Sequence, residues 1–395
     1  MHIEQINLKN FRSFKKAEMR DIPRFAILIG ANGTGKSTFF SIFGFLRDAM
    51  LTNVTTALAK LGGSRGFQEV RSRDSNEPIE IEIKFRAPPQ KHLITYTLSI
   101  NEKDGRAIVE HEVLKYRRGG HGKPWHFLDF KNGKGTAVTN EIDEKVSEEK
   151  DLKREEQELK SPDILAIKGL AQFEKFPAVK ALGTLIENWH VSDFHINKAR
   201  PEQEAGYAEY LSREGENLSN VVEYLYKQHR NVFDSIIEKL SKRVPGIASV
   251  ETKQTEEGRI LLKFRDGAFT DPFLARNVSD GTIKMLAYLV LLYDPNPHPL
   301  LCVEEPENQL YSTLLEELAE EFREYSRRGG QVFVSTHSPD FLNAAQLEEV
   351  FWLQKKDGYT TIKCARDDKQ IEAYMKEGDK MGWLWKQGFL GEVNP

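Results

Sequence analysis

Residues 30–37 read Gly-Ala-Asn-Gly-Thr-Gly-Lys-Ser and match the pattern GxxxxGK[ST] of a phosphate-binding loop at every fixed position. The apolar run 25–29 precedes the loop and favours a buried strand, and residues 37–50 continue with the apolar spacing of a helix. A strand, a glycine-rich loop and a helix N-terminus together direct several backbone N–H groups toward one anion. The stretch therefore predicts a binding site for a nucleoside triphosphate.

The residue types of this loop match the chemistry of a bound triphosphate. Gly30, Gly33 and Gly35 allow the backbone to approach phosphates without a Cβ clash. Lys36 would reach the β- and γ-phosphates, and the Ser37 hydroxyl would bind Mg²⁺. We expect a nucleoside triphosphate and Mg²⁺ as ligands, and we expect the nucleotide contacts of this loop to come from Asn32, Gly33, Thr34, Gly35, Lys36, Ser37 and Thr38.

Composition limits the other classes of function. The 395 residues suffice for one large domain or two ordinary ones, and 39% hydrophobic with 29% charged residues fits a soluble globular protein. A net charge of −4 gives no global attraction to nucleic acid, so such binding would need a local basic patch. Two cysteines are too few for a disulfide framework, and the apolar run 285–293 is about half of a membrane span. We therefore expect a cytoplasmic protein without a membrane segment.

The first third of the chain predicts antiparallel β-structure. Residues 3–19 alternate as a pair of strands. Polar and apolar residues then alternate in four further segments: 79–86, 93–100, 107–116 and 125–130. Turn signals at 103–105 and 119–120 separate them, so the pattern predicts an antiparallel sheet or meander.

Helices and short apolar strands alternate in the rest of the chain. The expected helices are 163–190, 217–243, 282–293 and 312–327, and the expected strands are 261–264, 299–303, 331–335 and a last one near 349–353. This alternation predicts an α/β fold with a mostly parallel core sheet covered by helices. The stretch 141–160 is dense in Glu and Lys, which favours a solvated helix or a loop, with a partner-binding arm as the alternative.

A second chemical feature is the segment 299–308, in which an apolar strand ends in the adjacent carboxylates Glu304 and Glu305. Ligands of α/β sheets collect at the carboxyl ends of the strands. One carboxylate can hold Mg²⁺ there while the next faces an attacking water. We therefore expect Glu304 to be a metal ligand and Glu305 a general base; the alternative is an acidic start of the following helix.

Three weaker features agree with this site. Ser279, Asp280 and Gly281 open the helix at 282, where they form either a second phosphate site or an ordinary N-cap. His337 follows the strand 331–335 and could bind a γ-phosphate or position water, although an isolated histidine is more often structural. Gln68 could contact Mg²⁺ or the water.

Taken in order, these segments resemble the ABC-type ATPases of the RecF/SMC/OLD group. The resemblance rests on Leu-Lys-Asn-Phe-Arg-Ser-Phe at 8–14, the Walker A loop, a signature-like 279–282, a Walker B strand with its following glutamate, and a switch at His337. The chain looks most like the compact RecF-like or OLD-like members, several of which serve in phage defence. The resemblance implies an ABC-type P-loop fold with an antiparallel β subdomain and a helical insertion.

The resemblance also implies domains and residue roles. It divides the chain into an N-terminal ATPase lobe (1–135), a charged and helical insertion (136–215) and a C-terminal ATPase lobe (216–395). Lys36, Glu305 and His337 would be catalytic, and Arg12 would approach the nucleotide near its phosphates. The signature residues Ser279, Asp280 and Gly281 would contact ATP held by a second subunit.

The chain departs from the family pattern at three places. Glu304 stands where Walker B usually supplies Asp, the signature reads Val-Ser-Asp-Gly-Thr instead of Leu-Ser-Gly-Gly-Gln, and Tyr311 replaces the usual Asp or His of the D-loop at 308–311. A longer metal ligand changes the geometry around the metal. These differences bear on the rate of hydrolysis more than on ATP binding.

The resulting hypothesis is an ATPase that dimerises around ATP and regulates or powers a DNA-directed assembly, with a separate nuclease or effector protein in an anti-phage system. The alternative is a repair or recombination ATPase of RecF type that binds DNA directly. Direct contact would use basic residues beside aromatic ones. The candidates are Arg65, Arg71 and Arg73 near Phe67, and Lys115, Arg117, Arg118 and Lys123 around a glycine-rich turn.

Three other classes fit less well. A transporter nucleotide-binding subunit would have a much shorter separation between Lys36 and its signature serine. A long-armed SMC protein needs sustained apolar heptads, which this chain lacks. The segment after His337 is too short for a TOPRIM nuclease domain, so we expect any nuclease activity in another protein.

Overall fold

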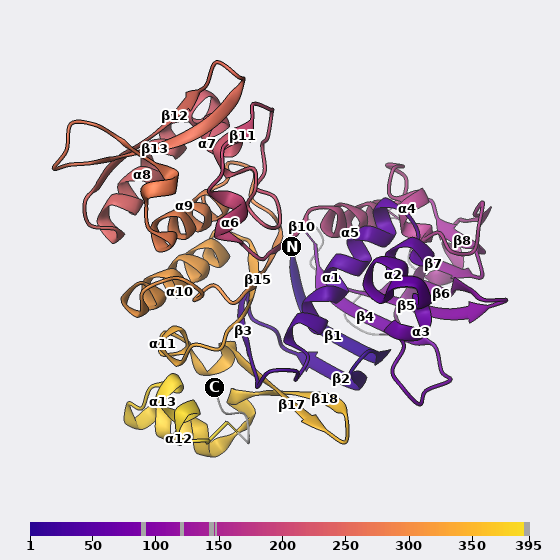
Figure 1. Ribbon diagram of the computed structural model, residues 1–395. Coiled ribbons are helices and arrows are strands. Elements are labelled where there is room, and N and C mark those ends of the chain that lie inside the picture. The colour runs from indigo at the N-terminus through magenta and orange to yellow at the C-terminus, as the bar shows by residue number, and fades with distance from the viewer. Residues whose placement is uncertain (88–91, 119–121, 142–145, 147, 391–395) are drawn as a thin grey trace. The chain divides into compact units, whose positions relative to one another are not determined.

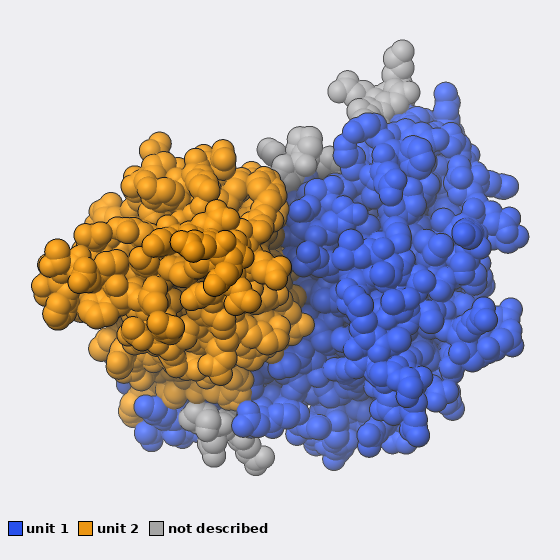
Figure 2. Space-filling model, turned by 45° about the horizontal axis from the view of Figure 1, so that its top comes forward, with its two compact units in different colours: residues 1–189, 346–379, 384–395 blue, residues 190–345, 380–383 orange. Residues whose placement is uncertain are grey.

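The computed structural model describes residues 1–87, 92–118, 122–141, 146 and 148–390. These residues form two compact units, coloured separately in Figure 2. Unit 1 comprises residues 1–189, 346–379 and 384–395, and unit 2 comprises residues 190–345 and 380–383. The turn predicted at 119–120 lies outside the described residues, as do 142–145 and 147 of the charged stretch. The three-part division expected from the family resemblance stays a prediction.

An eight-stranded antiparallel sheet dominates unit 1 and confirms the expected β region. Its order is β2-β1-β4-β5-β6-β7-β8-β9. In β4 every second residue from Ile79 to Phe85 is buried and the residues between them are charged, so one face of the strand joins the core. The strands are β1 (His2–Phe11), β2 (Phe14–Arg20), β4 (Ile79–Arg86), β5 (Leu93–Lys103), β6 (Arg106–Tyr116), β7 (Trp125–Lys131), β8 (Lys134–Val138) and β9 (Arg154–Glu158).

The charged stretch contains a strand where a helix or loop was expected. That expectation is wrong for β9, which pairs with β8 and ends the sheet. Lys134 forms an ion pair with Glu158 at 2.8 Å, and Lys175 forms one with Glu155 at 2.6 Å. An edge strand bonds through its backbone and needs no apolar side chains, and charges on it discourage pairing with other chains. Its composition therefore resembles that of a solvated segment.

A second group of strands in unit 1 leads to the phosphate-binding loop. β3 (Phe25–Ile29) pairs in parallel with β17 (Val350–Lys356), which pairs antiparallel with β18 (Tyr359–Cys364). All five residues of β3 are buried, as the apolar run predicts. The helix α1 (Lys36–Leu51) follows the loop and buries a row of phenylalanines along its length.

Helices α1, α2, α4 and α5 lie together on one side of the eight-stranded sheet (Figure 1). The helix expected at 163–190 is two helices, α4 (Ala166–Leu170) and α5 (Pro177–Glu187), and the second begins at a proline. The remaining elements of unit 1 are α2 (Val54–Gly62), η1 (Gly63–Arg65), α3 (Phe67–Val70), η2 (Glu149–Asp151), η4 (Leu347–Glu349), η5 (Ala365–Asp367) and α12 (Lys369–Glu377). The short α13 (Met381–Lys386) and β10 (Trp189–Ser192) each contain residues of both units.

Two buried glutamates accept hydrogen bonds from the first turns of these helices. Glu112 of β6 accepts hydrogen bonds from the backbone N–H of Ala166, at 2.5 Å, and of Ile167, at 3.0 Å. Glu141 accepts one from the N–H of Ala178 at 3.1 Å. These carboxylates satisfy N–H groups that the first turn of a helix leaves open. Burial raises the pKa of Glu112 to about 7, although the bonds from the two N–H groups oppose the rise.

Unit 2 contains a parallel strand pair with helices around it. β15 (Leu300–Glu304) and β16 (Gln331–Ser335) run parallel with α10 (Ser312–Arg327) between them in sequence. The predicted α/β class is confirmed, whereas a mostly parallel core sheet stays a prediction. The helix expected at 217–243 is two, α7 (Leu218–Gln228) and α8 (Arg230–Arg243), which pack beside a small antiparallel sheet. Its strands are β11 (Gln203–Glu204), β12 (Ile247–Gln254), β13 (Arg259–Asp266) and β14 (Phe273–Leu274).

The longest apolar run of the sequence is the core helix of unit 2. In α9 (Asp280–Leu292) every residue from Gly281 to Leu292 is buried. Among the described residues, no helix has the length and apolar character needed to cross a lipid bilayer. The unit also contains α6 (Ile196–Ala199), η3 (Ala275–Asn277) and α11 (Pro339–Leu342).

Candidate functional site

The predicted site residues divide between the two units. Unit 1 carries the phosphate-binding loop with Arg12 and Gln68. Unit 2 carries the signature segment at 279–281, the carboxylates Glu304 and Glu305, and His337. The chemistry of each half follows from the contacts inside its own unit.

The glycines of the loop are required by its conformation. Gly33 has φ +78° and Gly35 has φ +107°, in a region that L side chains rarely adopt. A Cβ at Gly35 would also lie 2.9 Å from the Ser13 hydroxyl oxygen and 3.2 Å from that of Thr360, whereas a Cβ at Gly33 would meet open space. The two glycines therefore serve different purposes, since Gly35 also permits close packing.

Lys36 lies inside the loop. Its side-chain ammonium donates to the Gly30 carbonyl at 2.6 Å, and the residue is 7% exposed. The loop is held from outside by Thr360 of β18, whose hydroxyl donates to the Thr34 carbonyl at 2.7 Å. The start of α1 carries no acidic side chain, so its positive end remains available to an anion. Asn32 and Ser37 are exposed, and Thr38 is half-buried.

Arg12 and Gln68 occupy less direct positions. Arg12 has φ +48° in the turn between β1 and β2, and its guanidinium donates to the Leu61 carbonyl at 2.6 Å. Gln68 is exposed on α3, where its amide lies 3.4 Å from a carboxylate oxygen of Glu102. A role of either residue at the nucleotide or metal stays a prediction. Thr360 was missed because a single threonine far from the loop in sequence gives no signal.

In unit 2 the backbone turns sharply between the two carboxylates. Glu304 is the last residue of β15 with 15% of its side chain exposed, and a guanidinium nitrogen of Arg213 lies 3.7 Å from its carboxylate. Glu305 has φ +44°, and its N–H donates to the Ser335 carbonyl at 2.9 Å. A non-glycine residue in this conformation is strained, and strained residues of this kind cluster at functional sites.

The turn brings Glu305 beside His337. One carboxylate oxygen lies 3.4 Å from the His337 Nε2 atom, and the other accepts a hydrogen bond from the Asn308 amide at 3.0 Å. A carboxylate held on two sides, with 41% of its side chain exposed, can accept a proton from a water in front of it. The structure thus places together two residues that the sequence separates by a helix and a strand.

Glu307 is a site residue that the sequence reasoning missed. It accepts a hydrogen bond from the backbone N–H of His337 at 2.6 Å, and burial raises the pKa of its carboxyl group. The contact fixes the segment that carries His337. The acidic run after the strand was a signal for it, but that run does not tell which carboxylate faces inward.

The signature segment begins α9. The Ser279 hydroxyl accepts a hydrogen bond from the Thr282 N–H at 3.3 Å, so it is an N-cap, and a role at a phosphate stays a prediction. Asp280 forms an ion pair with Arg200. A Cβ at Gly281 would lie 3.0 Å from the Gln309 carbonyl oxygen, which shows that glycine allows the helix to approach this backbone closely.

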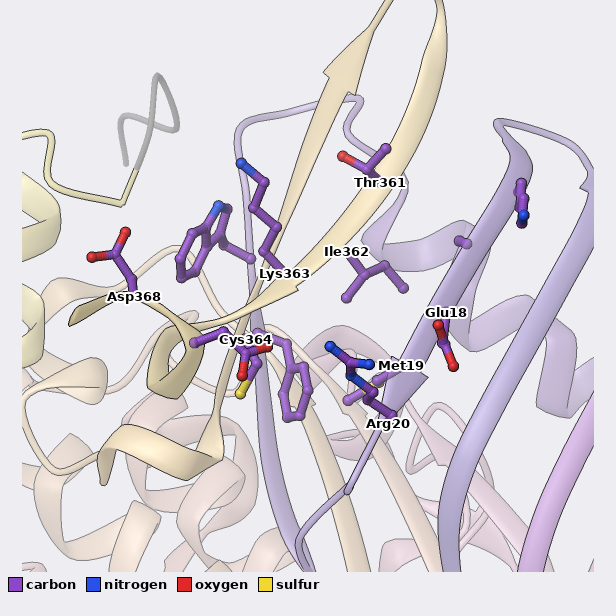
Figure 3. Close-up of a pocket in the computed structure, with 13 residues that line it drawn as sticks. Glu18, Met19, Arg20, Thr361, Ile362, Lys363, Cys364 and Asp368 are labelled. Carbon is purple, nitrogen blue, oxygen red and sulfur yellow. The ribbon is translucent and has the colours of Figure 1, made fainter. Parts of the chain in front are cut away.

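Of two cavities in the structure, one is lined by predicted site residues and the other is not. In unit 2 a cavity of about 390 Å³ is lined by Glu304 and Glu305 together with Lys284. In unit 1 a cavity of about 600 Å³ lies between β2 and β18, where Met19, Arg20 and Ile362 line it (Figure 3). None of the predicted site residues lines this second cavity.

Comparisons with known proteins identify the family and the fold of the chain. Residues 25–343 match the family described as "AAA domain, putative AbiEii toxin, Type IV TA system". A relative from Helicobacter pylori, named an ATP/GTP phosphatase, is 20% identical over 93% of each chain.

Solved structures of SMC heads have a similar fold. An SMC head bound to the C-terminal winged-helix domain of ScpA matches with a TM-score of 0.55 and 16% identity, over 92% of this chain and 98% of that one. An SMC head with an extended coiled coil, bound to the C-terminal domain of ScpA derived from Pyrococcus furiosus, matches with a TM-score of 0.54 and 13% identity, over 95% and 99%. The chain therefore belongs to this AAA family and is a P-loop ATPase with the α/β fold of an SMC head.

Proposed function

We propose that the protein hydrolyses ATP with Mg²⁺ and that Glu305 is the general base. The observation that carries the proposal is the Glu305–His337 pair at the end of β15, in a chain whose phosphate-binding loop encloses Lys36. The name of the Helicobacter pylori relative, an ATP/GTP phosphatase, supports the same reaction.

The protein residues have separate parts in this reaction. Lys36 and the N–H groups of the loop bind the β- and γ-phosphates and compensate charge that develops on them. Glu305 accepts the proton of the attacking water, and His337 and Asn308 keep its carboxylate in place. Glu307 holds the backbone of His337 and so supports this arrangement.

The oxygen donors of the chain fit a magnesium ion. The Ser37 hydroxyl and the Glu304 carboxylate are hard oxygen ligands of the kind that Mg²⁺ prefers, and Gln68 is the weaker candidate. A bound Mg²⁺ would supply positive charge that compensates the negative charge of the phosphates. Glu304 is one methylene longer than the usual Asp, so we expect slow turnover.

We further propose that two chains dimerise around ATP. The signature residues Ser279, Asp280 and Gly281 would contact nucleotide held by the partner, as in the ATPases that the chain resembles. Nucleotide state would then select between an open and a closed assembly. Arg12 would approach the phosphates from within its own chain.

Replacement of Glu305 with Gln tests the base and the dimer together. We expect E305Q to bind ATP, to lose at least about a hundredfold in kcat, and to accumulate as an ATP-bound dimer in light scattering. The matched control is E324Q on α10, where the same change affects an exposed side chain whose ion pair with Arg327 is long, at 3.5 Å. Hydrolysis by E305Q at the wild-type rate would show that another residue is the base.

We propose that this switch regulates a DNA-directed assembly in phage defence, with a separate nuclease or effector protein. Two observations support a partner: the family description names a toxin of a toxin–antitoxin system, and the similar SMC heads are bound to domains of ScpA. Plating of phage on cells that express the chain with its neighbouring genes tests the role. Protection should require Glu305, and protection by E305Q at the wild-type level would contradict it.

Direct DNA binding is the second candidate function, favoured by basic side chains on aromatic rings. The Arg71 guanidinium lies 5.1 Å from the Phe67 ring centroid, and that of Arg118 lies 6.0 Å from Trp125. Arg65 is partly neutralised by Glu69 at 3.4 Å. Phosphate contacts should make binding fall steeply with added salt. Absence of binding to duplex and single-stranded DNA at low salt with ATP would exclude this function.

A further inference from the structure

Lys284 is a buried cation of unit 2 that the proposed chemistry does not use. It lies on α9, the helix capped by Ser279, and only 2% of its surface is exposed. Among the described residues, none forms a hydrogen bond or an ion pair with its ammonium. Its ammonium makes a weak cation–π contact with the ring of Tyr288, whose centroid lies 5.9 Å from Nζ. Burial of an ammonium without a direct partner is costly, so a compensating purpose is expected.

Carboxylates surround Lys284 without touching it. It lines the cavity of about 390 Å³ together with Asp193, Glu304 and Glu305. Burial lowers the pKa of Lys284 to about 8, while the charges of Glu307, Asp193 and Glu305 act in the opposite direction. A polar cavity of this size holds several water molecules, which can bridge groups too far apart for a direct bond.

The Glu305 carboxylate must be held in place to act as a base. His337 and Asn308 contact it on two sides, and its backbone is in a strained conformation. A cation in the wall of the same cavity attracts the carboxylate from a further direction. A base displaced by about 1 Å can lose a hundredfold in rate, so such restraint matters.

We propose that Lys284 is a positioning residue for ATP hydrolysis, which restrains Glu305 through water in the cavity and thereby links the signature helix α9 to the catalytic end of β15. The inference rests on the proposed function, with Glu305 as base. Lys284 acts through Glu305 and does not itself touch the nucleotide. The charge is retained for catalysis, because the fold would be more stable without it.

Substitution by Met and by Arg separates the charge from the packing. K284M keeps a long unbranched side chain and removes the charge, whereas K284R keeps the charge. We expect K284M to lose about tenfold to a hundredfold in kcat with the KM for ATP changed by less than about twofold. K284R should recover most of this loss. The melting temperature of K284M should equal or exceed that of the wild type, because a buried unpaired charge has been removed.

Several outcomes would overturn the inference. A kcat of K284M within about twofold of the wild type would show that Lys284 does not restrain the base. A fall in melting temperature that accompanies the loss of kcat would identify a structural residue. An equal loss in K284R and K284M would show that the charge is not what matters.

The same measurements distinguish this inference from the proposed function. If the wild type hydrolyses no ATP, or if E305Q is as fast as the wild type, the assignment of the base fails, and the role of Lys284 fails with it. If E305Q is inactive and K284M keeps the wild-type rate, only the role of Lys284 is refuted.

Discussion

Gly33 and Gly35 provide a sharp test of the loop conformation, because the structure gives them different surroundings. Both have positive φ, +78° and +107°. A Cβ at Gly33 would meet nothing within 4 Å, whereas one at Gly35 would lie 2.9 Å from the Ser13 hydroxyl oxygen. G33A therefore imposes backbone strain alone, and G35A imposes backbone strain and a collision.

The magnitudes follow from these two contributions. Backbone strain at a non-glycine residue with positive φ costs about 1–2 kcal/mol. Overpacking of a well-packed site adds about 1–3 kcal/mol. We therefore expect G33A to lower the free energy of unfolding by about 1–2 kcal/mol and G35A to lower it by about 2–5 kcal/mol. ATP affinity should fall more in G35A, since the loop must move to accommodate the methyl group.

The assay is urea denaturation of the two variants in parallel with titration of a fluorescent ATP analogue. Ser13 provides an internal check, because its hydroxyl is buried and has no hydrogen-bond partner among the residues that the structure describes. S13A should cost little by itself and should restore part of the stability that G35A loses, in a double-mutant cycle. Equal losses in G33A and G35A, or no restoration by S13A, would refute the packing described for the loop.

Two further predictions concern other parts of the chain. Burial raises the pKa of Glu112 from 4.5 to about 7, so the folded protein favours the protonated carboxyl group. The stabilisation from this preference is complete below pH 4.5 and is lost as the pH rises through 7. The shift corresponds to about 3 kcal/mol in the free energy of unfolding. From about pH 5.5 to about pH 8.5, urea denaturation should therefore show the wild type losing about 2 kcal/mol relative to E112Q, and parallel pH curves would contradict this. A Cβ at Gly281 would lie 3.0 Å from the Gln309 carbonyl oxygen, so G281A should lower stability by about 1 kcal/mol and weaken the ATP-dependent dimer in light scattering, with ATP binding unchanged. An unaltered dimer would contradict the proposed place of this segment.

Much of the local structure could be predicted because its signals are short-range. The apolar run 25–29 is β3 as expected, and the segments predicted as strands at 79–86 and 331–335 have the observed bounds. In each case alternation or continuous apolarity reports how the strand is buried. A functional role of the paired carboxylates could also be predicted, because two charged groups directly after a buried strand are costly unless they have a partner or a ligand.

Other structural features could not be predicted from any local pattern in the sequence. The strand β9 is highly charged because an edge strand bonds through its backbone, and its composition therefore resembles that of a solvated segment. The segments expected as single helices at 163–190 and 217–243 are each broken into two helices. The place of each break depends on how the two shorter helices pack in the folded chain. The contact of Thr360 with the loop joins positions that are far apart in the chain.

The sequence by itself determined that the chain binds a triphosphate and ends a buried strand in two carboxylates, because both signals lie within about ten consecutive residues. Only the tertiary structure decided which side chains support these groups. His337 and Glu307 come together because parallel strands end at the same edge of the sheet. Lys284 of α9 lines a cavity together with Glu304 and Glu305. Burial and proximity between distant segments arise on folding, so no local pattern encodes them.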